Sequence, residues 1–318
     1  LARERGVRHV SVGGDVPLDE LVRASEPDIV LNAVVGFAGL PATLAALEDG
    51  IDLALANKES LVAAGALATD AAARGGGEII PVDSEHSAVH QCLEGRDPGT
   101  IAGIVLTASG GPFRGRAKAE LAGVSAEEAL AHPTWRMGPK ITIDSATLAN
   151  KGLEVIEAHW LFGIPYERIE VVVHPSSIVH SLVRLNDGAL LAHLGHPDMR
   201  VPISYALNHP RRVETPVAPL DLAGLTLTFE RPDLDAFPML ALARQAGMAG
   251  GTAPCAYNAA NEVAVALFLT GTIGFPDIAG TVENVLMRAT WPQARDLLDL
   301  ESADADARRL ATEWIESR

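Results

Sequence analysis

Two carboxylates, Asp83 and Glu85, follow the apolar stretch 78–82 in the sequence GEIIPVDSEH. On an extended strand, a spacing of two residues places both side chains on one face. Two such carboxylates could bind one hard divalent cation, of the kind that Mg²⁺ or Mn²⁺ represents, through their oxygens. Capping of a following helix is the structural alternative. The pair alone leaves both interpretations open.

A second group of polar residues lies on the strongest predicted helix of the chain, residues 145–163. Asn150 and Glu154 are four residues apart and share a helix face, with Lys151 beside them. Glu154 could supply a third carboxylate ligand, while Asn150 and Lys151 could hold a phosphate near the metal. The alternative is an exposed helix face with an incidental Lys–Glu pair. Ser145 could cap the helix, donate to an anion, or do both.

Two further segments have residue types that suit a phosphorylated substrate. Ser109 lies in TASGG, a Gly-rich turn after a predicted strand, where hydroxyl and backbone N–H groups could surround a phosphate. His132 opens a loop that holds Trp135 and Met137 and ends at Gly138. Large apolar side chains in such a loop are either part of the core or a lid that closes over a substrate and excludes water.

The elements that must position these residues are those of an α/β protein. Apolar strands are predicted over 28–36, 52–57 and 78–82, with helices over 40–50 and 60–73 between them. This alternation predicts a doubly wound parallel sheet. In such a sheet, ligands bind beyond the carboxyl ends of the strands, which is where NKES and DSEH lie.

The rest of the chain departs from that alternation. ITID, at 141–144, reads as a brief strand, and Asn186-Asp187-Gly188 predicts a hairpin that makes the second sheet mixed. A Pro-rich linker is expected over 207–235. Four helices follow, at about 236–249, 255–269, 276–289 and 303–317, and they predict a small helical bundle.

Composition excludes several classes of function. The chain has 318 residues, of which 48% are hydrophobic and 21% charged, an ordinary mix for two or three globular domains. The net charge of −16 argues against a nucleic-acid binder or an anionic-membrane binder, and no long apolar run predicts a membrane span. Two cysteines make no disulfide framework, which fits a reducing compartment. Three of the four lysines, Lys58, Lys140 and Lys151, fall within the polar motifs.

Seven motifs, in order along the chain, closely resemble the 1-deoxy-D-xylulose 5-phosphate reductoisomerase family. They are NKESLV, VDSEHSA, SGGPFR, HPTWRMGPKITIDSATLANKGLEVIEAHWLF, HPSSIVHSLV, HPDMRVPISYAL and NEVAVALFL. The resemblance implies a bacterial, cytoplasmic, homodimeric enzyme of non-mevalonate isoprenoid biosynthesis. Such an enzyme rearranges and reduces 1-deoxy-D-xylulose 5-phosphate to 2-C-methyl-D-erythritol 4-phosphate, using NADPH and Mg²⁺ or Mn²⁺, with Co²⁺ as a further candidate.

The resemblance also implies roles for individual residues. The metal ligands would be Asp83, Glu85 and Glu154. These three and Lys58 would form the catalytic centre, with Lys58 and Ser84 at the carbonyl and hydroxyl oxygens of the substrate. The residues that would hold the substrate phosphate are Ser109, Ser145, Asn150 and Lys151, with His132 closing over the substrate. Those along NADPH would be Asn57, Glu59 and Gly138. Trp135 and Met137 would form the lid.

One family feature is missing from the sequence. Family members begin with a strand and a turn of the type G-x-T-G-x-I-G that holds the NADPH pyrophosphate, and VGGD at 12–15 has neither this spacing nor its continuation. We therefore expect an N-terminally truncated chain. Residues 1–76 would be the remnant of a Rossmann-like NADPH domain, 77–206 a catalytic domain with the dimer sheet, 207–234 a linker and 235–318 a four-helix bundle.

Two alternatives to a working reductoisomerase follow from that missing turn. One is a catalytically silent fragment that binds metal and sugar phosphate but cannot hold NADPH. The other is a metal-dependent sugar-phosphate isomerase or aldolase that needs no NADPH, which the intact NKES motif argues against.

Overall fold

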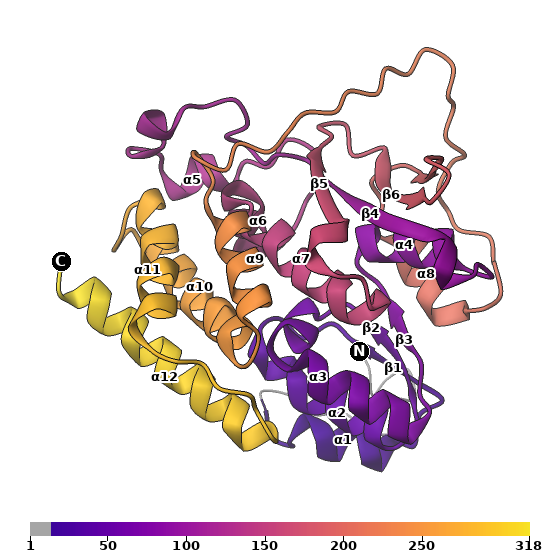
Figure 1. The fold of residues 1–318 in the computed structure, drawn as a ribbon, viewed down its shortest axis with the longest axis horizontal. Coiled ribbons are helices and arrows are strands. Elements are labelled where there is room, and N and C mark those ends of the chain that lie inside the picture. The colour runs from indigo at the N-terminus through magenta and orange to yellow at the C-terminus, as the bar shows by residue number, and fades with distance from the viewer. Residues whose placement is uncertain (1–13) are drawn as a thin grey trace.

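The structure is a computed structural model that describes residues 14–318, so the first two residues of VGGD lie outside the described part. It contains a parallel sheet, a mixed sheet and a set of C-terminal helices (Figure 1). The predicted fold class, α/β with a C-terminal helical bundle, is confirmed. Within residues 14–318, no helix is both long and apolar enough to cross a membrane.

The first sheet is three-stranded and parallel, in the order β1-β2-β3. Its strands are β1 (Ile29–Asn32), β2 (Asp52–Leu55) and β3 (Ile79–Pro81). The helices of this part are α1 (Leu18–Ser25), α2 (Leu40–Glu48) and α3 (Lys58–Gly75). A buried apolar cluster that includes Leu40, Leu47, Leu53 and Leu61 joins the sheet to these helices.

Strand β1 is shorter than the sequence predicts. The side chain of Asn32 donates hydrogen bonds to the carbonyl oxygen of Gly39 at 2.8 Å and to Oγ1 of Thr43 at 2.9 Å. The backbone after Asn32 therefore leaves the sheet and forms a loop, residues 33–39, which ends in a short 3-10 turn. This loop forms one wall of the cavity described below.

The second sheet has four strands in the order β5-β4-β6-β7. Strand β4 pairs parallel with β5 and antiparallel with β6, and β6 pairs antiparallel with β7. The strands are β4 (Ile101–Ala108), β5 (Ile169–Val173), β6 (Val179–Leu185) and β7 (Leu190–Leu194). The predicted hairpin thus joins β6 to β7, and the sheet is mixed as expected.

The segment ITID is helical, so the predicted strand is wrong. Helix α6 (Pro139–Thr147) begins with a proline in its first turn, a position that favours a helix start. The sequence Ile-Thr-Ile-Asp alternates apolar and polar residues as a strand does. In the helix, Ile143 is buried in the core and Ile141 lines the cavity.

The predicted long helix is broken at Leu148. This residue takes a left-handed conformation with φ 63°, which ends α6 and starts α7 (Ala149–Phe162). Ser145 therefore lies in the last turn of α6 and is not a helix cap. Figure 1 shows α7 in the middle of the molecule, where it packs against β4, β5, α9 and α10.

Asp83 and Glu85 do not lie on a strand, so the argument from strand faces is wrong. Asp83 is the N-cap of α4 (Ser84–Leu93) and accepts hydrogen bonds from the backbone N–H groups of Glu85 and His86. Glu85 is in the first turn of that helix. The capping alternative is therefore correct, and it does not prevent the two carboxylates from lying close together.

The C-terminal helices pack on one another and on α3, α6 and α7. Together with two earlier helices, they complete the fold: α5 (Ala126–Leu130), α8 (Arg200–Asn208), α9 (Met239–Ala249), α10 (Ala253–Leu269), α11 (Phe275–Arg288) and α12 (Leu297–Glu316). Helix α12 begins six residues before the predicted start at 303, because the Asp296 side chain caps it by accepting from the N–H of Asp299. The capping box of Ser125 and Glu128 in α5 is present.

Candidate active site

A cavity of about 330 Å³ lies at the carboxyl ends of β1, β2, β3 and β4 and is closed on the other side by α6 and α7. Of the residues predicted for the site, only Asn57 and His132 do not line it. Those that do are Lys58, Glu59, Asp83, Ser84, Glu85, Ser109, Trp135, Met137, Gly138, Ser145, Asn150, Lys151 and Glu154. The folded chain thus brings together residues separated by up to about a hundred positions in the sequence.

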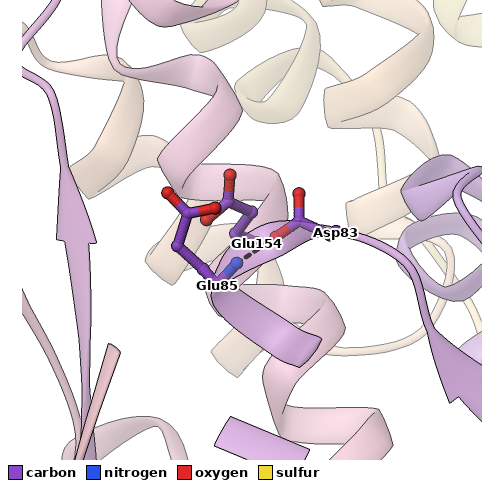
Figure 2. Close-up of side chains that lie close together, drawn as sticks. All are labelled: Asp83, Glu85 and Glu154. Carbon is purple, nitrogen blue, oxygen red and sulfur yellow. Dashed lines mark hydrogen bonds between the residues drawn. The ribbon is translucent and has the colours of Figure 1, made fainter. Parts of the chain in front are cut away.

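Three carboxylates converge in this cavity. Oxygens of Asp83, Glu85 and Glu154 lie within 4.8 Å of one another, and Glu154 is fully buried. Figure 2 shows Glu85 on the first turn of α4 beside Glu154 on α7, with Asp83 at the cap of α4. In the described part of the chain, this is the only cluster of three or more His, Cys, Asp or Glu side chains close enough to share one metal ion.

Two lysines balance much of this negative charge. The ammonium of Lys58 lies 2.7 Å from Oδ2 of Asp83 and 3.3 Å from Oε1 of Glu154, and it donates to Oδ1 of Asn150 at 2.8 Å. The ammonium of Lys151 lies 3.0 Å from Oε1 of Glu85 and also pairs with Glu154. Three acidic and two basic side chains therefore leave a formal charge of −1.

The electrostatics of the cluster shift the pKa values of Lys58, Asp83 and Glu154. Burial disfavours the charged form of Lys58, but Asp83 and Glu154 outweigh it, and the pKa of Lys58 is raised well above its ordinary value. Burial also opposes the charge on Asp83, but Lys58 outweighs it, so that the pKa of Asp83 is lowered. For Glu154, burial and the charges of Asp83 and Glu85 act together and raise the pKa.

A buried histidine and a fourth carboxylate lie behind the cluster and were not singled out from the sequence. Nδ1 of His86 is 3.1 Å from Oδ1 of Asp83 and 3.2 Å from Oε2 of Glu157, and its Nε2 is 2.9 Å from the carbonyl oxygen of Glu154. Burial lowers the pKa of His86, but Glu157 and Asp83 raise it overall to about 9. Burial raises the pKa of Glu157 to about 7. The spacing of Glu157, one helical turn after Glu154, was the available sequence signal.

The predicted phosphate-binding serine is held by the predicted lid histidine. Nε2 of His132 lies 2.9 Å from Oγ of Ser109. Nδ1 of His132 accepts from the backbone N–H groups of Thr134 at 3.1 Å and Trp135 at 2.9 Å. Because Nδ1 is an acceptor, Nε2 carries the proton of the neutral ring and donates to Ser109. Burial lowers the pKa of His132, which is consistent with a neutral ring.

The cofactor-side residues form a polar network at the start of α3. Asn57 caps this helix by accepting from the N–H of Ser60, and its amide donates to the carbonyl oxygen of Gly36 at 2.9 Å. Asn57 therefore supports the loop of residues 33–39 from behind and does not face the cavity. Glu59 pairs with Lys140 at 2.9 Å.

Lys140 is a further member of this network, and the sequence predicted no role for it. It lies 2.9 Å from Oδ2 of Asp144, one turn along α6, as well as from Glu59. The ion pairs thus tie the start of α3 to α6. Met199, from the HPDMR motif, also lines the cavity.

The residues present fit both a divalent cation and a nucleotide. The cluster offers only carboxylate oxygens, which Mg²⁺ and Mn²⁺ prefer, and their spacing of less than 4.8 Å suits one ion. The wall that follows β1 and β2 is apolar, consisting of Ala33, Val34, Val35 and Ala56. It suits the face of a planar ring, at the strand ends where open α/β sheets bind nucleotides.

Three sequence profiles of known families match this chain. A profile described as "1-deoxy-D-xylulose 5-phosphate reductoisomerase" matches residues 2–65, and one described as its "C-terminal domain" matches residues 79–162. A third, described as "DXP reductoisomerase C-terminal domain", matches residues 194–310.

Similar sequences and solved structures carry the same name. The 1-deoxy-D-xylulose 5-phosphate reductoisomerase of Heliobacterium modesticaldum is 53% identical over 313 residues, which cover 98% of this chain and 80% of that protein. The protein of that name from Symbiobacterium thermophilum is 57% identical over 297 residues, covering 92% of this chain and 76% of that protein.

Among solved structures, the reductoisomerase from Zymomonas mobilis in complex with NADPH has a TM-score of 0.89 at 47% identity, covering 95% of this chain and 78% of that one. A DOX-P reductoisomerase in complex with NADPH, fosmidomycin and magnesium has a TM-score of 0.91 at 42% identity, covering 99% and 82%.

Proposed function

This chain belongs to the 1-deoxy-D-xylulose 5-phosphate reductoisomerase family, and from that premise we propose that it converts 1-deoxy-D-xylulose 5-phosphate to 2-C-methyl-D-erythritol 4-phosphate, using NADPH and a divalent cation. The observation that carries the proposal is the cluster of Asp83, Glu85 and Glu154 in a cavity that also holds Ser109. An acidic cluster suits a cation, and the nearby hydroxyl suits the phosphate of a sugar phosphate.

In the proposed reaction, Asp83, Glu85 and Glu154 hold the cation. The cation supplies Lewis-acid polarisation of the ketose oxygens, and NADPH supplies the hydride. Lys58 lies beside Asp83 and Glu154, so its ammonium is placed to stabilise negative charge that develops on a substrate oxygen. Ser84, which donates to Oε2 of Glu85 at 2.6 Å, can instead bond a substrate hydroxyl.

The phosphate of the substrate is proposed to bind Ser109, Ser145, Asn150 and Lys151. These residues lie on the turn after β4 and on α6 and α7. Binding the phosphate uses contacts remote from the reacting carbons to orient them toward the cation. His132 fixes the hydroxyl of Ser109, and Trp135 and Met137 cover the cavity and exclude water.

NADPH is proposed to lie along the loop of residues 33–39 and the start of α3, with Glu59 and Gly138 at its edge. Asn57 acts there by holding the loop. We further propose Mg²⁺ or Mn²⁺ as the cation, a cytoplasmic location and a homodimer. Support for the dimer is the row of exposed apolar side chains in the segment before α9: Leu222, Leu225, Leu227, Phe229 and Leu234.

The test is NADPH consumption in the presence of the sugar phosphate and Mg²⁺, with and without a chelator. The proposal expects turnover that requires both the sugar phosphate and the cation, and that is lost in Glu154→Gln. Glu127→Gln removes an exposed carboxylate of α5 and serves as the matched control. Binding of Mg²⁺ and sugar phosphate without any binding of NADPH would contradict the proposal and favour the catalytically silent alternative.

A further inference from the structure

Glu262, on helix α10 among the C-terminal helices, contacts the loop of residues 33–39, which lies near the other end of the sequence. Its Oε1 accepts from the backbone N–H of Phe37 at 3.2 Å and from the amide of Asn258 at 2.9 Å. Its Oε2 pairs with Nη2 of Arg308 on α12 at 2.5 Å. Arg308 is itself held by two hydrogen bonds from its guanidinium to Asp304. The carboxylate of Glu262 is therefore oriented before it meets the loop.

The loop of residues 33–39 accepts and donates hydrogen bonds on two sides. Asn57 bonds the carbonyl oxygens of Val34 and Gly36 from the start of α3, and Glu262 bonds the N–H of Phe37 from α10. Gly36 has φ +76°, and a Cβ placed there would lie 2.7 Å from Oε1 of Glu262. The loop conformation and the position of Glu262 thus depend on each other. Val34 and Val35, in the same loop, line the cavity.

The same turn of α10 is also attached to the opposite wall of the cavity. Asn261 donates to Oδ1 of Asp144 at 2.8 Å, and Asp144 pairs with Lys140 at 2.9 Å. Asp144 and Ser145 both lie on α6 and line the cavity. Adjacent residues of one helix therefore hold the cofactor-side loop and the substrate-side helix. Helix α10 packs against both α6 and α3.

We propose that Glu262 is a positioning residue that fixes the loop of residues 33–39 at the distance from α6 that NADPH binding requires. This role rests on the proposed function, since NADPH is the ligand expected along that loop. Glu262 acts through the N–H of Phe37 and does not itself line the cavity. A hydrogen bond to a charged group lowers the equilibrium constant for opening of such a loop by a factor of about 10 to 100. The metal cluster has no contact with Glu262, and its affinity should not change.

The test compares Glu262→Ala with the wild-type chain in two measurements. Amide hydrogen exchange of peptides that cover residues 33–40 reports on the loop without any ligand, and calorimetry measures NADPH and Mg²⁺ affinities separately. We expect exchange of this loop to rise by about 10- to 100-fold and NADPH affinity to fall by about 10-fold or more, with unchanged Mg²⁺ affinity. Glu262→Gln keeps an acceptor for Phe37 and should recover most of the exchange protection.

The control is Val285→Ala, which removes buried volume from α11 of the same bundle without a contact to the loop. It should lower the stability of the bundle and leave loop exchange and NADPH affinity unchanged. Unchanged loop exchange in Glu262→Ala would overturn the proposal, as would equal effects of Val285→Ala, or faster exchange with unaltered NADPH affinity. If the wild-type chain binds no NADPH, the proposed function fails, while the exchange measurement still decides whether Glu262 holds the loop.

Discussion

Replacing Lys58 by Met should destabilise the chain when metal is absent and make it bind metal more tightly. The side chain of Lys58 is 11% exposed and its ammonium neutralises Asp83 and Glu154. Its removal leaves the three acidic groups with only Lys151 and His86 as positive partners. Breaking a buried ion pair costs about 3–5 kcal/mol. With an unfolding entropy of about 2.1 cal/mol/K per residue, or about 0.67 kcal/mol/K for 318 residues, Tm should fall by about 4–8 °C.

Metal should reverse part of this loss, because the cation and the ammonium of Lys58 neutralise the same carboxylates. Thermal unfolding of Lys58→Met and wild type would be measured with a chelator and again in saturating Mg²⁺. By linkage, each decrease of about 2 °C in the difference in Tm between the variant and wild type, or about 1.4 kcal/mol, corresponds to a tenfold tighter Mg²⁺ affinity in the variant. Calorimetric titration with Mg²⁺ gives that affinity independently.

Lys118→Met is the matched control, since it makes the same substitution at an exposed lysine. Its unfolding free energy should change by less than about 0.5 kcal/mol with or without Mg²⁺. A wild-type Tm for Lys58→Met in chelator would show that Lys58 does not neutralise the cluster. A difference in Tm between the variant and wild type that Mg²⁺ does not change would show the same.

Three further outcomes are expected. Glu154→Gln should weaken Mg²⁺ binding by at least about 100-fold in calorimetry, more than the loss of a residue behind the ligands would; an affinity within tenfold of wild type would remove Glu154 from the ligand set. His132→Ala, which frees the hydroxyl of Ser109, should raise KM for the sugar phosphate by about 10-fold and leave Mg²⁺ affinity unchanged; an unchanged KM would separate Ser109 from phosphate binding. Burial, with His180 and Arg212 nearby, lowers the pKa of His193 to about 4. The unfolded chain therefore binds a proton at His193 below about pH 6.5, whereas the folded chain does not. The stability that the neutral ring contributes is present above about pH 6.5 and is lost as the pH falls toward 4. In denaturant titrations, the free energy of unfolding should fall between pH 7 and pH 5 by about 1–2 kcal/mol less in His193→Gln than in wild type. Equal decreases would show that the pKa of His193 is not lowered in the folded chain.

Much of the site could be predicted from short-range patterns in the sequence. The carboxylates of DSEH and the helix with Asn150, Lys151 and Glu154 lie together as expected, because both segments end or begin at the same edge of the sheets. The hairpin at Asn186-Asp187-Gly188 also had a local signal.

Other features depend on contacts between distant segments, and these leave no local pattern. The geometric argument for Asp83 and Glu85 used a strand, whereas a helix cap brings the same two side chains together. Leu148 breaks the predicted long helix although it is an ordinary helix former. Glu262 contacts Phe37, which lies 225 positions away, and no local sequence pattern predicts this contact.

The variants described above test the roles of individual residues at the site. The structure places all of the predicted residues except Asn57 and His132 around one cavity, and membership in the family indicates the reaction. Which side chain holds the cation, the phosphate or the nicotinamide is what the variants above decide.

We propose that this chain both rearranges and reduces its sugar phosphate in one cavity. The most direct measurement incubates the chain with 1-deoxy-D-xylulose 5-phosphate, Mg²⁺ and NADPH that carries deuterium at the transferred position, and identifies the product by NMR and mass spectrometry. We expect 2-C-methyl-D-erythritol 4-phosphate with one deuterium for each NADPH consumed. An unbranched product, or a branched product without deuterium, would contradict it.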